Sequence, residues 1–206
     1  MKPKRNAPTP IFDTAESMGN PFKSKSFDAS PFFYDMNPAA GVNIDYEYGL
    51  KFLFSYNGST ATFNAYRREL ERFFQWSWRI ESKSILLHKR EDIEEYVRFC
   101  LNPPLAWIGT KTTPRFVTKD GLKSSNPAWR PFVVTVKKDQ HRKGVIADTK
   151  NYMMSQSGVK SLFTALSSFY DFLSQEELTD SNPVALIRQK SKFIRKDHNK
   201  AVVRRI

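Results

Sequence analysis

The sequence predicts a mainly α-helical domain of four to five helices, with one basic, partly β insertion and an extended N-terminal arm. Apolar side chains recur at steps of three and four residues in separate stretches between residues 46 and 196. Prolines gather before residue 46 and within residues 103–155, where they prevent long helices. The 206 residues are 40% hydrophobic and 14% aromatic, which is enough for one buried core.

Residues 1–45 are expected to form an extended, partly disordered arm. They contain six prolines and no helical or alternating pattern that lasts for a whole element. They also contain six aromatic residues, more than an idle linker needs: Phe12, Phe22, Phe27, Phe32, Phe33 and Tyr34. We therefore expect the arm to dock on a partner or on the helical domain.

Three helices are predicted before the insertion. The first covers residues 46–56, and the second runs from a cap at Ser59 or Thr60 to about Ile80. In the second helix the apolar stripe points inward and the charged side chains are expected to face solvent, namely Arg67, Arg68, Glu69, Glu71 and Arg72. The third helix covers residues 90–101 and ends at two consecutive prolines.

The insertion at residues 103–155 is predicted to carry a small β-ribbon. Two β-prone runs, residues 115–118 and 132–136, could flank the hairpin-type turn at Asp120-Gly121. A fourth helix then begins at Ser157 and carries one long apolar stripe. A last helix is predicted to start at Asn182-Pro183 and to run into residues 190–196.

The charge of the chain indicates a polyanionic partner. The formal net charge is +12, and residues 111–150 hold ten basic and three acidic groups. Residues 188–206 hold eight basic groups and one acidic group, so two docking surfaces are favoured over a uniformly basic shell. Nucleic acid is the expected partner and an acidic membrane surface the less common one, although solvated loops and a basic tail would have the same composition.

The sequence offers no recognisable active site. His88, His141 and His198 lack a second ligand at zinc-site spacing, and no Gly-rich phosphate loop appears. Cys100, the single cysteine, has the position of a buried helix residue and excludes an internal disulfide. No apolar run approaches the ~20 residues of a membrane span. Sequence order alone leaves Ser/His/Asp arrangements open, and we expect no cofactor, no metal and no membrane association.

Two segments resemble the core-binding (SAM-like) N-terminal domain of tyrosine recombinases, the phage-integrase family. STATFNAYRRELERFFQW, residues 59–76, is similar to the family's opening pattern S-x-x-T-x-x-x-Y-x-x-x-L-x-x-F. SLFTALSSFYDFL, residues 161–173, followed by Asn182-Pro183, is similar to a second signature of that domain. The resemblance covers roughly residues 46–196, and neither the insertion nor the arm is part of it.

The resemblance implies DNA binding without catalysis by this part of the protein. The family's chemistry lies in a second, C-terminal domain that supplies an Arg, a Lys, a His-x-x-Arg pair, a further His or Trp, and a Tyr nucleophile. None of these maps onto this sequence, so residues 197–206 are expected to begin a linker to an absent catalytic domain. The resemblance further implies strand exchange on duplex DNA, self-association with other recombinase protomers, and a cytoplasmic, nucleoid-associated setting in a prokaryote or phage.

Backbone contacts to DNA are expected at helix N-termini and in the basic blocks. The candidates on the helices and on the basic exit are Thr60, Thr62, Arg67, Arg68, Lys160, Ser161, Lys190, Lys192, Arg195 and Lys196. The candidates in the insertion are Lys137, Lys138, Arg142 and Lys143. Two other functions are weighed: a stand-alone nucleic-acid-binding module, and a protein–protein adaptor whose contact surface is the arm together with Trp76, Trp78, Trp107 and Trp129.

Overall fold

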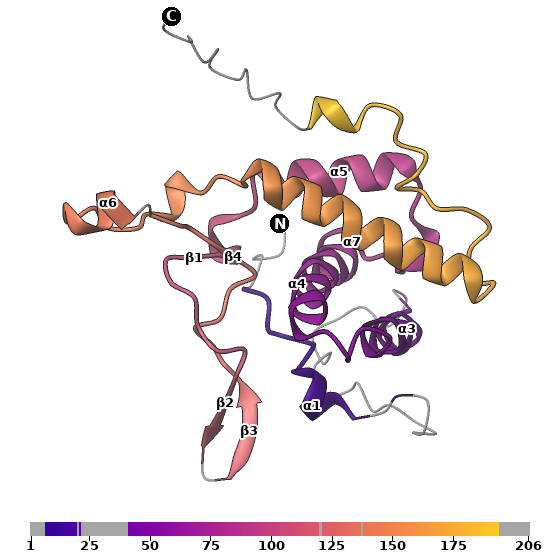
Figure 1. The fold of residues 1–206 in the computed structure, drawn as a ribbon, viewed down its shortest axis with the longest axis horizontal. Coiled ribbons are helices and arrows are strands. Elements are labelled where there is room, and N and C mark those ends of the chain that lie inside the picture. Colours follow the sequence, from indigo (N-terminus) through magenta and orange to yellow (C-terminus); the bar gives the residue numbers. More distant parts are fainter. Residues whose placement is uncertain (1–6, 20, 22–40, 120, 137, 194–206) are drawn as a thin grey trace, which may run out of the picture.

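The computed structural model describes residues 7–19, 21, 41–119, 121–136 and 138–193 (Figure 1). The fold is mainly α-helical, as the sequence predicts. Its four long helices are α3 (Val42–Phe54), α4 (Thr60–Trp76), α5 (Arg90–Leu101) and α7 (Gln156–Gln175). Helix α3 starts four residues before its predicted position, whereas α5 has its predicted bounds.

Helix α4 lies at the centre of the core and packs on α3 and α7. The Ser59 side chain caps it by accepting a hydrogen bond from the Thr62 N–H. Phe73 and Phe74 form edge-on or tilted ring contacts with Tyr170 and Phe169 of α7. The helix continues as the π-helical segment η2 (Ser77–Glu81), which ends at Ser82 in the left-handed conformation, with φ of 51°.

A buried carboxylate of α3 holds the segment that connects α4 to α5. Asp45 of α3 accepts hydrogen bonds from the Trp78 indole N–H at 2.8 Å and from the Ile85 N–H at 2.9 Å. Ile85 opens the 3₁₀ turn η3 (Ile85–Leu87), and its carbonyl accepts the Tyr170 hydroxyl of α7 at 2.8 Å. Burial raises the pKa of Asp45 to about 6.

Part of the arm belongs to the core. Ile11 and Phe12 are fully buried, and the Phe12 ring stacks on Tyr46 with 5.4 Å between ring centroids. Gly49 of α3 permits this approach, because a Cβ there would lie 2.7 Å from a Phe74 carbon and 3.0 Å from Phe12. The short helix α1 (Ala15–Met18) follows. The remaining arm aromatics, at positions 22, 27 and 32–34, lie outside the described residues.

The predicted β-ribbon forms, but its second strand is not the predicted one. Strand β2 (Phe116–Lys119) pairs antiparallel with β3 (Leu122–Ser125), the polar run directly after Gly121. The prediction that residues 132–136 form the second strand of this ribbon is wrong. Phe132 is fully buried against Phe99 and Tyr152, and its strand β4 (Phe132–Val133) pairs parallel with β1 (Ile108–Gly109). Burial of the Phe132 ring therefore places residues 132–133 beside β1 in the core and not in the ribbon.

Short helical segments complete the insertion and the C-terminal part. They are η4 (Leu105–Trp107), α6 (Lys138–Arg142), η5 (Thr149–Asn151) and η6 (Lys190–Lys192). The predicted last helix does not form as one helix, since residues 183–186 form a turn and residues 190–192 form only the 3₁₀ segment η6. The Asn182 side-chain oxygen Oδ1 accepts the N–H groups of Val184 and Ala185, and the side-chain Nδ2 donates to the Ser167 carbonyl at 3.0 Å. These bonds attach the segment around Val184 to α7 and satisfy its N–H groups although residues 183–186 are not helical.

Candidate nucleic-acid interface

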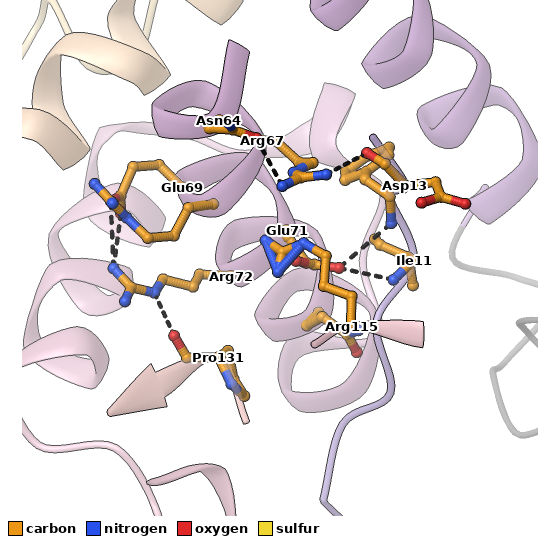
Figure 2. A network of polar contacts seen from close by, with 12 residues as sticks. Ile11, Asp13, Asn64, Arg67, Glu69, Glu71, Arg72, Arg115 and Pro131 are labelled. Atoms are coloured by element: carbon orange, nitrogen blue, oxygen red, sulfur yellow. Dashed lines mark hydrogen bonds and ion pairs between the residues drawn. The ribbon is translucent and has the colours of Figure 1, made fainter. Parts of the chain in front are cut away.

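The charged face of α4 is covered by other parts of the chain (Figure 2). We expected Glu69 and Glu71 to face solvent, but both side chains are only 1% exposed, so that prediction is wrong. The arm covers one side of this face and the insertion covers the other. Burying two carboxylates requires compensating partners, because an isolated charge in the interior is strongly unfavourable.

Glu71 holds the arm and the insertion together. Its Oε1 accepts the N–H groups of Ile11 at 2.7 Å and of Phe12 at 3.3 Å. Its Oε2 lies 2.6 Å from Nη2 of Arg115, at the base of strand β2. The Arg115 guanidinium also lies over the Trp129 ring, 5.3 Å from its centroid. Burial raises the pKa of Glu71, while Arg115 and the two N–H groups favour the ionised form.

Glu69, two residues before Glu71, accepts hydrogen bonds from two arginines. Arg68 donates from Nε to Glu69 at 2.8 Å, and Arg72 donates from Nη1 at 3.1 Å. Arg72 also donates from Nε to the Pro131 carbonyl at 2.8 Å, and its guanidinium lies 4.7 Å from the Phe132 ring centroid. Arg72 is therefore fixed against the insertion, whereas the Arg68 side chain is 47% exposed.

Arg67 lies beside a second guanidinium. It donates from Nη1 to the Asp13 carbonyl at 2.6 Å and from Nη2 to Asn64 at 2.7 Å. Burial and the nearby positive charge of Arg115 lower the pKa of Arg67 to about 10. Within the described part of the chain, the Nε atoms of Arg67 and Arg115 are buried without a hydrogen-bond partner. An anion close to this pair would relieve their mutual repulsion.

These side chains line an open cleft of about 550 Å³ between α4, the start of α7 and the insertion. The cleft contains two glutamates, Glu69 and Glu71, and more arginines than are needed to neutralise them. Those arginines are Arg67, Arg68, Arg72, Arg115 and Arg130. Hydroxyl groups of Thr112, Thr113, Ser155, Ser157 and Ser161 add hydrogen-bond donors. We call this site the arginine cleft.

The arginine cleft brings together three of the residues predicted to bind DNA: Arg67, Arg68 and Ser161. Lys160 is exposed on the adjacent position of α7. Thr60 and Thr62 do not line the cleft, and the Thr62 hydroxyl lies 3.0 Å from Ser59 Oγ, in the cap of α4.

The other predicted residues lie elsewhere or are not described. Lys190 lies over the Phe163 ring, and Lys192 donates to Glu94 at 2.6 Å. Arg142 and Lys143 are exposed near α6, which extends away from the helices in Figure 1. Lys137, Arg195, Lys196 and the side chain of Lys138 lie outside the described part of the structure.

Arg72, Arg115 and Arg130 are cleft residues that the sequence did not identify as a site. Arg72 was expected to face solvent, because a charged face opposite an apolar stripe is typical of a surface helix. No sequence pattern links Arg115 to α4, because its partner Glu71 is distant in the chain. Arg130 donates to the nearby carbonyls of Pro127 and Trp129, and nothing in that local pattern marks it as a cleft residue.

The described residues contain a Ser/His/Asp arrangement, Ser77, His88 and Asp92, but the direction of its hydrogen bonds does not activate the serine as a nucleophile. Ser77 Oγ lies 2.6 Å from His88 Nε2, and His88 Nδ1 lies 3.7 Å from Asp92. The Ser77 hydroxyl donates to the Lys83 carbonyl at 2.5 Å, so Nε2 of His88 must be the donor to Ser77 rather than its base. Ser77 is fully buried, and burial lowers the pKa of His88 to about 4. Burial also raises the pKa of the Cys100 thiol to about 12.

No family model, curated protein or solved structure matches the chain. Among the described residues, no three His, Cys, Asp or Glu side chains are placed to hold a metal ion, and no helix has the length and apolarity of a membrane span. The four tryptophans are buried in the structure and so do not offer the exposed contact surface weighed for an adaptor.

Proposed function

We propose that this chain binds the phosphate backbone of duplex DNA through the arginine cleft, as the core-binding part of a tyrosine recombinase. Strand exchange would be carried out by a separate catalytic domain, with other protomers bound to the same DNA. The observation that supports this proposal is the convergence of five arginines from α4 and the insertion on one open cleft. The setting that this function requires is the cytoplasm of a prokaryote or of a phage-infected cell.

The cleft has features that favour a phosphate ligand. Arginine presents its donors in a planar fork that matches phosphate oxygens. Glu69 and Glu71 hold the guanidinium groups in place before any ligand arrives, so binding costs little side-chain entropy. The juxtaposition of Arg67 and Arg115 leaves positive charge that a phosphate diester would compensate.

The two segments that resemble the recombinase domain both border this cleft. Residues 59–76 form the cap and body of α4, and residues 161–173 belong to α7. Helices α4 and α7 pack directly on each other, and Arg68 of one and Ser161 of the other line the same opening. The same face would also serve a stand-alone nucleic-acid-binding module, which differs from the recombinase proposal only in lacking a catalytic partner domain.

The test is fluorescence anisotropy of the full chain with a 30-bp DNA duplex at several salt concentrations. The variant combines Arg68→Gln with Arg130→Gln, and the control is Arg98→Gln on α5, whose side chain is 51% exposed outside the cleft. Each phosphate that is no longer neutralised should flatten the log–log salt slope by roughly 0.9, so the double variant should bind more weakly and with a smaller slope. Equal slopes for the parent and the double variant would overturn the proposal.

A further inference from the structure

The β2–β3 ribbon extends away from the helices (Figure 1), and Arg115 at its base lines the arginine cleft. Every described residue from 117 to 124 is exposed, including Leu122 at 76% and Val117 at 38%. An exposed apolar side chain of this size at the tip of a short ribbon gains nothing from the fold itself.

The base of the ribbon is fixed although its tip does not touch the core. Arg115, the residue before β2, is held by Glu71. Asn126, the residue after β3, donates from its N–H to the Arg115 carbonyl at 2.9 Å and from its side chain to the Pro114 carbonyl at 2.8 Å. The ribbon is therefore a rigidly rooted projection, and its root and the cleft share Arg115.

The two faces of the ribbon differ. The register pairs Phe116 with Ser125 and Thr118 with Lys123, and on this face Lys123 pairs with the Asp13 carboxylate of the arm. The opposite face carries Val117, Lys119, Leu122 and Ser124. The side chains of these four residues make no hydrogen bond or ion pair with the described parts of the chain. We call this the free face of the ribbon.

We propose that the free face of the β2–β3 ribbon enters the major groove of the duplex held by the arginine cleft; the inference rests on the proposed function. A major groove is ~12 Å wide and ~8.5 Å deep and admits a two-stranded ribbon. A four-residue strand spans roughly 13 Å, so the turn can reach the floor of the groove. Lys119 and Leu122, which flank the turn, would then contact base edges: the ammonium a guanine O6/N7 pair, and the isobutyl group a thymine methyl.

Charge favours DNA over a second copy of this chain as the occupant. Residues 111–130 hold five basic residues and one acidic residue. Edge-to-edge pairing of two ribbons would bring these like charges together, which opposes association. A polyanion instead gains from the same charges, and the Ser124 hydroxyl on the free face can serve as a further donor.

The test compares a ribbon variant, Lys119→Ala with Leu122→Ala, with a control, Leu87→Ala with Lys89→Ala. The control removes the same residue types from exposed positions before α5. The probes are a 30-bp duplex and the same duplex with its cytosines replaced by glucosylated hydroxymethylcytosine, which fills the major groove. The ribbon variant should bind the plain duplex about three- to tenfold more weakly than the parent. It should also be less sensitive than the parent to glucosylation, while the control behaves as the parent does.

The outcomes separate the two proposals. If the parent binds neither duplex, the proposed function and the ribbon inference both fail. If the parent binds and the ribbon variant matches it, or is equally sensitive to glucosylation, only the ribbon inference fails. If the variant loses a concentration-dependent dimer seen by analytical ultracentrifugation but keeps its DNA affinity, the free face binds a second copy instead. Thermal unfolding of both variants should match the parent, because all four side chains are exposed.

Discussion

Glu71 in the middle of α4 and Arg115 at the base of the β2–β3 ribbon form a buried ion pair, with 2.6 Å between Oε2 and Nη2. The same carboxylate accepts the backbone N–H groups of Ile11 and Phe12. One side chain thus connects the central helix to the arm and to the insertion. The helix pattern could reveal neither of these two connections.

Replacing Glu71 by Gln should destabilise the fold strongly. The amide oxygen can still accept from Ile11, but Arg115 and Arg67 would lose the charge that compensates their own. We expect a loss of about 2–4 kcal/mol in the free energy of unfolding, measured by urea titration. Glu95→Gln on α5, whose side chain is 64% exposed, is the control and should change stability by less than about 0.5 kcal/mol. An unchanged midpoint for Glu71→Gln would mean that the pair contributes nothing.

Asp45 and His88 should have opposite effects on stability across the same pH range. The pKa of Asp45 rises from 3.8 to about 6 on folding, so its contribution to stability falls as pH rises through this range. The pKa of His88 falls from 6.5 to about 4, so the unfolded chain takes up a proton first and stability falls as pH drops. Each effect is about 3 kcal/mol, and the two nearly cancel in the parent.

Asp45→Asn should remove the contribution of Asp45 to the pH dependence of stability and leave that of His88. Stability of this variant should fall more steeply than that of the parent as pH drops from 6.5 to 4, measured by thermal unfolding at fixed ionic strength. Other titrating groups are shared with the parent and cancel in the comparison. Parallel pH profiles for the two proteins would contradict the prediction.

Gly49→Ala should disturb the docking of the arm. The new methyl group would lie 2.7 Å from a Phe74 carbon, closer than real contacts allow, and 3.0 Å from a Phe12 carbon, which is tighter than most real contacts. Overpacking of this kind costs about 1–3 kcal/mol. Gly58→Ala is the matched control, since nothing lies within 4 Å of a Cβ there and it should be neutral. Circular dichroism melting of the two variants measures the difference, which should be absent if the Phe74 ring and the arm can both shift without cost.

Replacing Lys137, Lys138, Arg142 and Lys143 together by Ala should weaken DNA binding across unrelated sequences. Arg142 and Lys143 are exposed near α6, so replacing them should leave thermal stability nearly unchanged. The salt slope should flatten by roughly 0.9 for each phosphate that these side chains neutralise in the parent. Binding equal to the parent at low salt would show that this part of the insertion does not contact DNA.

The chain alone should form no covalent complex with a nicked suicide duplex. The family's His-x-x-Arg pair and nucleophilic tyrosine do not map onto its sequence. Tyr46 and Tyr152 are also poor nucleophiles, because burial raises their pKa values above the ordinary value of 10. Denaturing gel electrophoresis after incubation measures this, and an adduct that maps to any tyrosine of the chain would overturn the prediction.

Periodicity predicted the four long helices and most of their apolar faces, although in α3 it is Phe52 that is buried and Phe54, expected to face inward, that is only half-buried. The bounds of α5 and the starts of α4 and α7 follow from caps and prolines that act locally. Periodicity could not show that Glu69 and Glu71 are buried, because the partners that make this possible, Arg115 and the Ile11 N–H, are distant in sequence. The same limit explains Phe132, whose β-prone surroundings suggest a ribbon residue although its ring packs on Phe99 and Tyr152.

The site was predicted only in part for a related reason. Arg67 and Arg68 could be predicted as DNA contacts from their positions on the second predicted helix. Ser161 could be predicted from its position near the start of the fourth predicted helix. Arg115 and Arg130 of the insertion also line the cleft. They could not be predicted, because the sequence does not show how the insertion packs against α4. The last predicted helix fails because the bonds made by the Asn182 side chain satisfy the backbone without helical continuation.

The anchoring of the arm also sets an order of events during synthesis. Ile11 leaves the ribosome sixty residues before Glu71, the side chain that will hold its N–H group, and Arg115 follows later still. The first buried segment to be translated therefore cannot be fixed until α4 has been made. Closing such long loops costs chain entropy before any contact repays it, which slows folding. Until α4 has emerged, Ile11 and Phe12 lack the partners that bury them and remain exposed to chaperones and proteases.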